Sequence, residues 1–293
     1  MKNILKKTYY RFTKKDQLKS YNIKLSYIFH TEKIYDDDLF DQLMRFCKSY
    51  FEFTNVKPIC AIIPPTNALL KKEMMVNNFS EEEFINRVNK LSNFADIGYH
   101  GHFYLNNKPT YFNAIHCNSY KKSDLTEQFI NDINWFDKNK ISHNNIYSAG
   151  WWFMNQDLIA LLVKYGFQFD FSFSKSPYFY NQFSNKILNL NKIKFGENFE
   201  VQIAKNKKIT CIQNLIGFHS SKFPEDFDRN IMKLIDSKNN IIGVVNSHDY
   251  DLSYENTLNC IKYQIKFNKV KFCSYQDLLS ENNIKLIKLI TSD

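Results

Sequence analysis

The stretch "ADIGYHGHFYLNN" (residues 95–107) ends a short apolar run in two histidines that flank one glycine. The apolar run predicts a buried strand, with His100 and His102 at its C-terminal end. Residues two apart on an extended segment project to the same side, so both imidazoles would face one point. Gly101 between them adds no bulk and lets the backbone bend. Neutral imidazole is a usual ligand of catalytic zinc, so the stretch predicts a metal site. For His102, a contact with substrate or with a metal ligand is the alternative.

Strands and helices alternate on both sides of this stretch. Apolar runs predict strands at 24–29, 58–65, 95–100, 145–150, 167–174, 240–251 and 270–275. Helical spacing of apolar residues predicts helices at 38–51, 81–94, 124–139, 155–166, 226–238 and 254–267. Ser80 and Glu83 form a capping box before the second of these helices. Between about 175 and 222 we expect short β segments at 186–190, 199–204 and 208–217, in part as hairpins. Strand–helix repetition implies parallel strands joined by right-handed crossovers, and about seven such units favour a barrel over an open sheet.

Polar side chains gather at the predicted strand ends, where the chemistry of a βα barrel lies. The first strand ends "FHTE" (29–32), with His30 and Glu32. The later ends carry His100, His102, Ser148, Trp151, Trp152, Asp170, Ser172, Ser174, Ser247, His248 and Asp249. Glu32 is a candidate carboxylate ligand, with a salt bridge as the alternative. His116, in the loop after the histidine pair, is a further candidate ligand or a plain surface histidine.

The order of these motifs resembles the polysaccharide deacetylase family, carbohydrate esterases with a NodB-like barrel, over about residues 24–280. "ADIGYHGHFY" is similar to the family's histidine motif, and "IYSAGWWFMNQDLIALLVKYGFQFDFSFS" is similar to its third motif. "IIGVVNSHDYD" and "VKFCSYQDLL" resemble its last two strands. The resemblance implies an α/β fold, a distorted (β/α)7-type barrel, and removal of an acyl group from a sugar. The expected domains are a basic leader (1–23) and a single barrel (24–293).

The resemblance also implies roles for the histidines. The family's first strand ends in paired aspartates, one a general base and the other a metal ligand. Here Glu32 and His30 would take these two roles, in an order that stays open. Glu32, His100 and His102 would hold a divalent metal, zinc being the first expectation. His248 would protonate the leaving amine, a task that suits a near-neutral imidazole.

The chain departs from the family's pattern at three positions. Tyr104 stands where the family has its second histidine, Ser148 where it has an arginine, and Gly150 where it has a proline. The residues expected to bind substrate are Tyr104, Ser148, Trp151, Trp152 and Asp249. For the aromatic residues, core or rim packing is the alternative, and Asp249 would cap a loop or contact substrate. The departures make a catalytically inactive glycan-binding or scaffold protein on the same barrel the alternative function.

The charge and composition of the chain limit the classes of binding partner that we expect. The 293 residues carry a net charge of +9, much of it in the leader, which we expect to be solvated or to contact anionic lipid. The sequence contains no recognised nucleic-acid module, so we expect no nucleic-acid partner. No apolar run approaches the roughly 20 residues of a membrane helix. Six scattered cysteines indicate reduced thiols and a cytoplasmic protein, with the inner face of the membrane as an alternative site. We therefore expect an acylated substrate made in the cell, a sugar nucleotide or a lipid-linked glycan.

Overall fold

A computed structural model describes residues 22–104, 121–173, 182–183, 193, 196–218, 227, 240–268, 270–278 and 285–288. Its strands are β1 (Asn22–Thr31), β2 (Ile59–Ile62), β3 (Asp96–Gly101), β4 (Ile146–Ala149), β5 (Phe153–Met154), β6 (Phe169–Asp170), β7 (Gln182–Phe183), β8 (Phe199–Ala204), β9 (Lys207–Cys211), β10 (Asn214–Phe218), β11 (Asn240–His248), β12 (Lys271–Phe272) and β13 (Lys285–Lys288). Its helices are α2 (Asp37–Thr54), α3 (Ala68–Val76), α4 (Glu81–Ser92), α5 (Lys122–Lys138), α6 (Gln156–Lys164) and α9 (Tyr254–Asn268), with 3-10 turns η3 (Gly150–Trp152) and η5 (Asp249–Asp251). Among these helices, none has both the length and the hydropathy that crossing a membrane requires.

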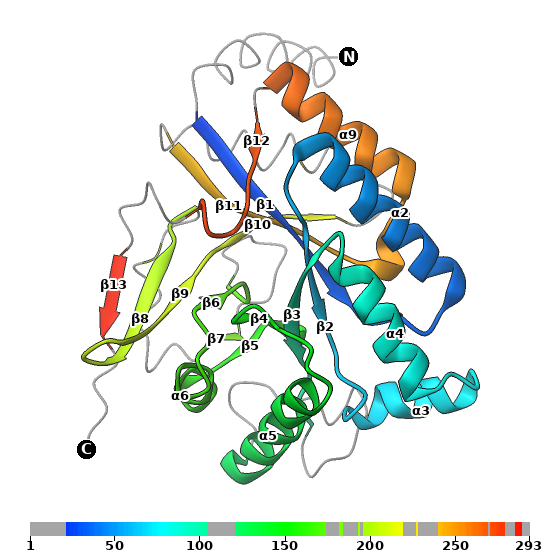
Figure 1. Cartoon of the computed structure of the whole chain (residues 1–293). Helices are drawn as coiled ribbons and strands as arrows, with labels where there is room; N and C mark the ends of the chain where they lie inside the picture. The colour runs from blue at the N-terminus through cyan, green and yellow to red at the C-terminus, as the bar shows by residue number, and fades with distance from the viewer. Residues whose placement is uncertain are drawn as a thin grey trace, which may run out of the picture.

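Most of these strands form one curled sheet in the order β10, β11, β1, β2, β3, β4, β6, β9, β8, β13, in which β12 also pairs with β1. Strands β5 and β7 form a separate two-stranded sheet. From β10 to β9 the neighbours run parallel, while β8 and β9 form an antiparallel hairpin, as expected for this part of the chain. The sheet curls into a half-barrel, with α2, α4, α5 and α9 along its outer side (Figure 1). The predicted α/β fold, with parallel strands joined through helices, is confirmed.

In two of the predicted β segments, side chains take the place of strand partners. The carboxylate of Asp170 accepts the backbone N–H of Ser172 at 2.9 Å, which turns the chain and ends β6. The segment 208–217 divides into β9 and β10. At the division, the backbone N–H of Gln213 donates to the side-chain oxygen of Asn198 and not to the backbone of a neighbouring strand. Strand β1 begins at Asn22, two residues before the predicted start.

Helix α3 is an element that the sequence analysis missed. Asn67 caps it, since its side-chain oxygen accepts the backbone N–H groups of Leu69 and Leu70. The predicted helix at 226–238 falls almost wholly outside the described residues. The predicted β segment at 186–190 and all but the last two residues of the predicted leader fall outside them as well.

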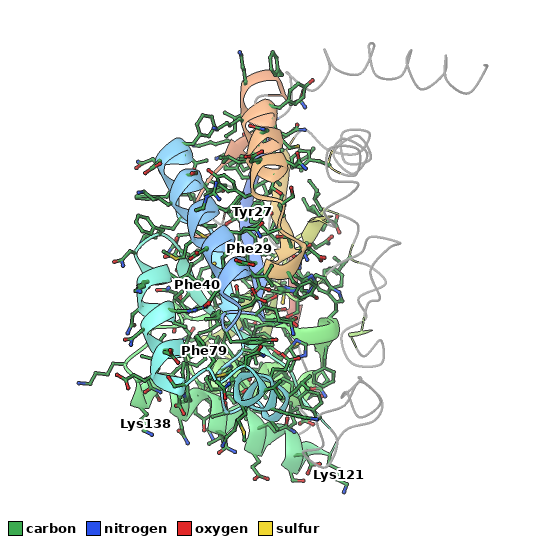
Figure 2. The ribbon with its side chains drawn as sticks, turned by 90° about the vertical axis from the view of Figure 1, so that its right-hand side faces the viewer. Tyr27, Phe29, Phe40, Phe79, Lys121 and Lys138 are labelled. Atoms are coloured by element: carbon green, nitrogen blue, oxygen red, sulfur yellow. The ribbon has the colours of Figure 1, made fainter. Side chains whose placement is uncertain are left out.

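The core forms where α2 packs on β1. Helix α2 begins at Asp36, whose side chain accepts the backbone N–H of Leu39 at 3.0 Å. The rings of Tyr27 and Phe29, on β1, lie 5.3 and 5.2 Å from the ring of Phe46, on α2, and Figure 2 shows them beneath that helix. With both faces buried, β1 is a central strand, and its C-terminal end is held firmly.

Helix α4 begins with the predicted capping box. The Ser80 hydroxyl accepts the backbone N–H of Glu83 at 3.1 Å, and the Glu83 carboxylate accepts the backbone N–H of Ser80 at 2.8 Å.

Candidate functional site

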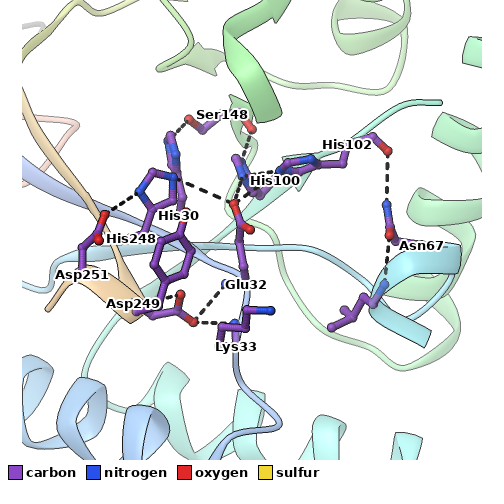
Figure 3. Close-up of polar contacts among 12 residues, drawn as sticks. His30, Glu32, Lys33, Asn67, His100, His102, Ser148, His248, Asp249 and Asp251 are labelled. Carbon is purple, nitrogen blue, oxygen red and sulfur yellow. Dashed lines mark hydrogen bonds and ion pairs between the residues drawn. The ribbon is translucent and has the colours of Figure 1, made fainter. Parts of the chain in front are cut away.

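Neighbouring strand ends bring distant histidines together. In the register of the sheet, His30 of β1 lies beside His248 of β11, and His100 of β3 lies beside Ser148 of β4. Strand β2 separates β1 from β3, but the curl of the sheet lets side chains converge across it. The rings of His30 and His100 stack with their centroids 4.4 Å apart. Figure 3 shows these side chains around Glu32, which directly follows β1.

Glu32, His100 and His102 direct one ligand atom each to a common centre. The Nε2 atoms of the two histidines are 3.0 Å apart, and Glu32 Oε1 lies 3.4 Å from the first and 3.5 Å from the second. The three ligand atoms lie within 4.8 Å of one another. Among the residues that the structure describes, this is the group of histidine, cysteine and acidic side chains with metal-binding geometry.

His100 has the protonation state of a metal ligand. Its Nδ1 lies 2.8 Å from the backbone carbonyl oxygen of Ser148, which can only accept, so the ring hydrogen resides on Nδ1. Burial lowers the pKa of His100 to about 4, despite the opposing effect of Glu32. At neutral pH the ring is therefore uncharged, with the lone pair of Nε2 directed to the centre of the cluster.

The three side chains fit a divalent cation. Burial alone would raise the pKa of Glu32, but its contacts with His100 and His102 hold it well below the usual range, so the carboxylate is ionised. Glu32 Oε1 lies 3.4 Å from His100 Nε2 and 3.5 Å from His102 Nε2, so one carboxylate oxygen and two imidazole nitrogens face a common point. Imidazole nitrogen and carboxylate oxygen are ligands that zinc accepts.

His30 lies beside the cluster rather than in it. Its Nε2 hydrogen-bonds the Ser148 hydroxyl at 2.9 Å, and its ring lies 5.4 Å from that of Trp152. Burial, reinforced by His100 and His248, lowers the pKa of His30 well below its usual range. Of His30 and Glu32, Glu32 is therefore the one that joins the donor set.

His248 approaches Glu32 from the side opposite His102 (Figure 3). Its Nδ1 lies 3.2 Å from Asp251 Oδ2, and its Nε2 lies 3.9 Å from Glu32 Oε1. Burial lowers the pKa of His248, but the hydrogen bond to Asp251 and the charge of Glu32 outweigh burial and raise it. His248 is thus suited to carry a proton on the nitrogen that faces the cluster.

Asp249 caps the loop that carries Glu32. One carboxylate oxygen accepts the backbone N–H groups of Glu32 at 3.0 Å and Lys33 at 2.7 Å. The side chain is 1% exposed, and burial raises its pKa to about 7. Of the two roles expected for Asp249, the structure shows the loop cap. Its influence on a substrate would pass through the position of Glu32.

The other predicted substrate residues have different surroundings. Ser148 is fully buried and its hydroxyl bonds His30, and its expected contact with substrate stays a prediction. Tyr104 is 3% exposed, and the side chain of Gln128 bonds both its backbone N–H and its carbonyl. Trp152 is half-buried beside His30, with a φ of 59°. The side chain of Trp151, with Ser174 and His116, falls outside the described part of the chain.

Asn67 holds His102 in place, a role that the sequence analysis did not identify. Its Nδ2 donates to the backbone carbonyl of His102 at 3.3 Å, while its Oδ1 caps α3. An asparagine before a helical apolar pattern is a recognisable N-cap signal. The contact with His102, 35 residues away, depends on the tertiary structure.

One cavity lies beside His102, and a second cavity adjoins it. The first, of about 220 Å³, has His102 and Tyr104 in its wall. The second, of about 580 Å³, lies among α3, α4 and α5 and includes Trp135. Thr66 and Asn131 line both cavities, so the two adjoin and together lead outward from His102.

No protein-family model and no curated protein matches the sequence. Solved structures do match. A protein from Mycobacterium smegmatis assigned to the polysaccharide deacetylases superposes with a TM-score of 0.56 at 10% identity, covering 88% of this chain and 89% of that chain. The chain has the polysaccharide deacetylase fold.

Two further structures resemble this deacetylase fold. A 4-alpha-glucanotransferase from Thermococcus litoralis superposes with a TM-score of 0.52 at 11% identity, over 91% of this chain and 40% of that chain. A peptidoglycan N-acetylglucosamine deacetylase superposes with a TM-score of 0.49 at 10% identity, covering 94% of this chain and 99% of that chain. Because part of a glucanotransferase also superposes on this chain, the fold alone does not select the reaction, and the side chains of the site must decide it.

Proposed function

We propose that this protein is a metal-dependent hydrolase that removes an acyl group, in the first place N-acetyl, from a carbohydrate. The observation that carries the proposal is the convergence of Glu32, His100 and His102 at the strand ends of a deacetylase fold. A divalent cation held by these side chains would act as a Lewis acid on the acyl carbonyl. Three protein ligands leave a further position open, as catalytic zinc sites do.

The neighbouring histidines are placed for the proton transfers of amide hydrolysis. His30 is uncharged at neutral pH and stacks on His100, so it is the candidate proton acceptor. His248, whose Nδ1 faces Asp251, is the candidate donor to the departing amine. The two rings lie 5.1 Å apart, close enough to serve one scissile bond.

The cavity beside His102 is the place we propose for the sugar. Its wall includes the side chains of Gln128, Asn131 and Asp132, which suit hydroxyl groups. The adjoining cavity, with Trp135 and Lys138, would take the rest of the substrate. The substrate class that we propose is an acylated sugar nucleotide or lipid-linked glycan made in the cytoplasm, with the basic leader near the membrane.

The metal site is tested by zinc binding. Tag-free protein offered Zn²⁺ should bind about one ion per chain, and His100→Ala should abolish this binding, because it removes the best-oriented ligand. His143→Ala is the control, since His143 stacks on Phe167 at 4.4 Å and is not a member of the cluster. A parent protein that takes up no stoichiometric zinc would refute the metal site.

The reaction is tested by acetate release from N-acetylated sugars, their oligomers and acylated sugar nucleotides. We expect release by the zinc-loaded parent and its loss with a chelator or with His100→Ala. Zinc bound with no release from any of these substrates would favour the second candidate.

The second candidate is a glycan-binding protein without catalysis, and the burial of His30 favours it. Its side chain is 3% exposed, and its Nε2 already bonds Ser148, whereas a general base must reach the proton that it abstracts. Such a protein would bind glycan with an affinity that His30→Ala leaves unchanged.

A further inference from the structure

Gly150 lies directly against the ring of His102. It is the first residue of η3, immediately after β4. A Cβ at this position would lie 2.4 Å from His102 Cδ2, 2.5 Å from Nε2 and 2.6 Å from Cγ. Carbon atoms do not approach an aromatic ring this closely, so any side chain at position 150 would displace the imidazole.

Several contacts fix the position of His102 and its imidazole. The residue is 7% exposed, and Asn67 holds its backbone carbonyl. Its ring meets that of His100 edge to face, with the centroids 4.7 Å apart, and its Nε2 lies 3.5 Å from Glu32 Oε1. A displacement away from position 150 would therefore break the geometry of the donor set.

We propose that Gly150 is a positioning residue, whose lack of a side chain allows His102 to complete the donor set. This inference rests on the proposed function, in which Glu32, His100 and His102 bind metal. Tyr104, the position at which the resembled pattern has its second histidine, is instead buried with its backbone held by Gln128. In this chain His102 joins the donor set, and Gly150 leaves room for its ring.

Other tightly packed glycines contact different neighbours. A Cβ at Gly98 would lie 2.9 Å from the side chain of Ile146, and one at Gly243 would lie 2.4 Å from Leu215. These contacts lie in the core and involve no side chain of the donor set. Gly98→Ala is therefore a matched control that adds the same methyl group to the sheet without touching a proposed ligand.

The experiment is a double-mutant cycle with Zn²⁺ as the probe. The variants are Gly150→Ala, His102→Ala, both together, and Gly98→Ala, each titrated with zinc by calorimetry. We expect Gly150→Ala and His102→Ala to weaken zinc binding by a similar factor of about tenfold or more. The double variant should bind zinc no more weakly than either single variant, because both changes remove the same ligand. Gly98→Ala should keep the affinity of the parent.

Urea unfolding of the metal-free variants separates this inference from the proposed function. Gly150→Ala should lower the unfolding midpoint in the parent and much less in the His102→Ala background, where the ring is gone. Equal effects in the two backgrounds, or parental zinc affinity for Gly150→Ala, would overturn the inference. A parent that binds no zinc would instead refute the proposed function, while the steric coupling would still be measured.

Discussion

His30 and Glu32 are two residues apart, yet their side chains meet different partners. Glu32 follows the end of β1 and faces His100 and His102, whereas His30 is still in the strand and bonds Ser148. The backbone of Glu32 is held by the carboxylate of Asp249. At the scale of single residues, the site combines the ionised carboxylate of Glu32, the uncharged imidazoles of His30 and His100, and the Asp249 carboxylate that fixes the loop.

His248→Ala tests the proposed general acid. We expect turnover to fall about 10²-fold or more with zinc content unchanged, because general acid catalysis contributes roughly 10²–10⁴. Steady-state kinetics with elemental analysis measure both quantities. Loss of zinc together with activity would make His248 a ligand, and unchanged turnover per folded molecule would remove it from the mechanism.

Two buried serines on different strands of the sheet test how much the bond to His30 stabilises the fold. Ser148→Ala should lower the free energy of unfolding by about 1–3 kcal/mol, because it leaves the buried Nε2 of His30 without this partner. Ser26 is the matched control, since its buried hydroxyl has no hydrogen-bond partner among the described residues, and Ser26→Ala should cost little or stabilise. Chemical denaturation measures both, and equal losses would contradict the assignment.

Helix α5 docks on the sheet through a buried carboxylate. Asp132 accepts a hydrogen bond from the Tyr99 hydroxyl of β3 at 2.7 Å, and another from Thr66, in the loop before α3. Both Thr66 and Asp132 line the cavity beside His102. At the scale of elements, this contact joins the parts of the cavity wall that come from α5 and from the loop before α3.

The docking contact should make stability depend on pH. Burial raises the pKa of Asp132 to about 7, although Thr66 and Tyr99 oppose the shift, whereas an unfolded aspartate has a pKa of about 3.9. Between these values the folded state binds more protons than the unfolded state, so stability falls as pH rises from about 4 to about 7. Asp132→Asn should remove this pH-dependent loss of stability, because asparagine does not ionise.

Denaturation of parent and Asp132→Asn at pH 5 and pH 8 measures the effect. The variant's free energy of unfolding relative to the parent should rise by about 1 kcal/mol or more between the two pH values. A difference that does not change with pH, or that falls, would show that Asp132 titrates normally.

At the scale of the whole molecule, the metal-binding cluster, the first cavity and the second cavity lie next to one another in space. The half-barrel brings β1, β3 and β11 to one edge, and α3 and α5 carry the cavity walls outward from His102. Because Thr66 and Asn131 belong to both cavities, a long substrate would have to pass between them. The arrangement suits a substrate that extends beyond the acylated sugar.

Asn131→Trp should block the passage between the cavities. We expect KM for an acylated trisaccharide to rise about tenfold, equivalent to ~1.4 kcal/mol, with a smaller effect on the monosaccharide. Glu127→Trp, an exposed position on the same helix that lines neither cavity, is the control. Equal KM changes for both substrates would contradict a substrate that extends through the passage.

The sequence by itself determined the order of the elements and the places where chemistry could occur. Apolar runs predicted the central strands, the Ser80 capping box predicted the start of α4, and the strand ends predicted His100, His102 and His248. These features are local, because burial pattern and capping depend on residues a few positions apart. The resemblance of the motifs indicated the fold, which the solved structures bear out.

Only the tertiary structure decided which side chains meet. The sequence left the roles of His30 and Glu32 open, and it could not show that Asn67 holds His102 or that Gly150 makes room for its ring. Strand register and sheet curl bring together residues that are 35 to 220 positions apart. Distances of a few ångströms across such separations depend on the packing of the whole core, and no local pattern in the chain encodes them.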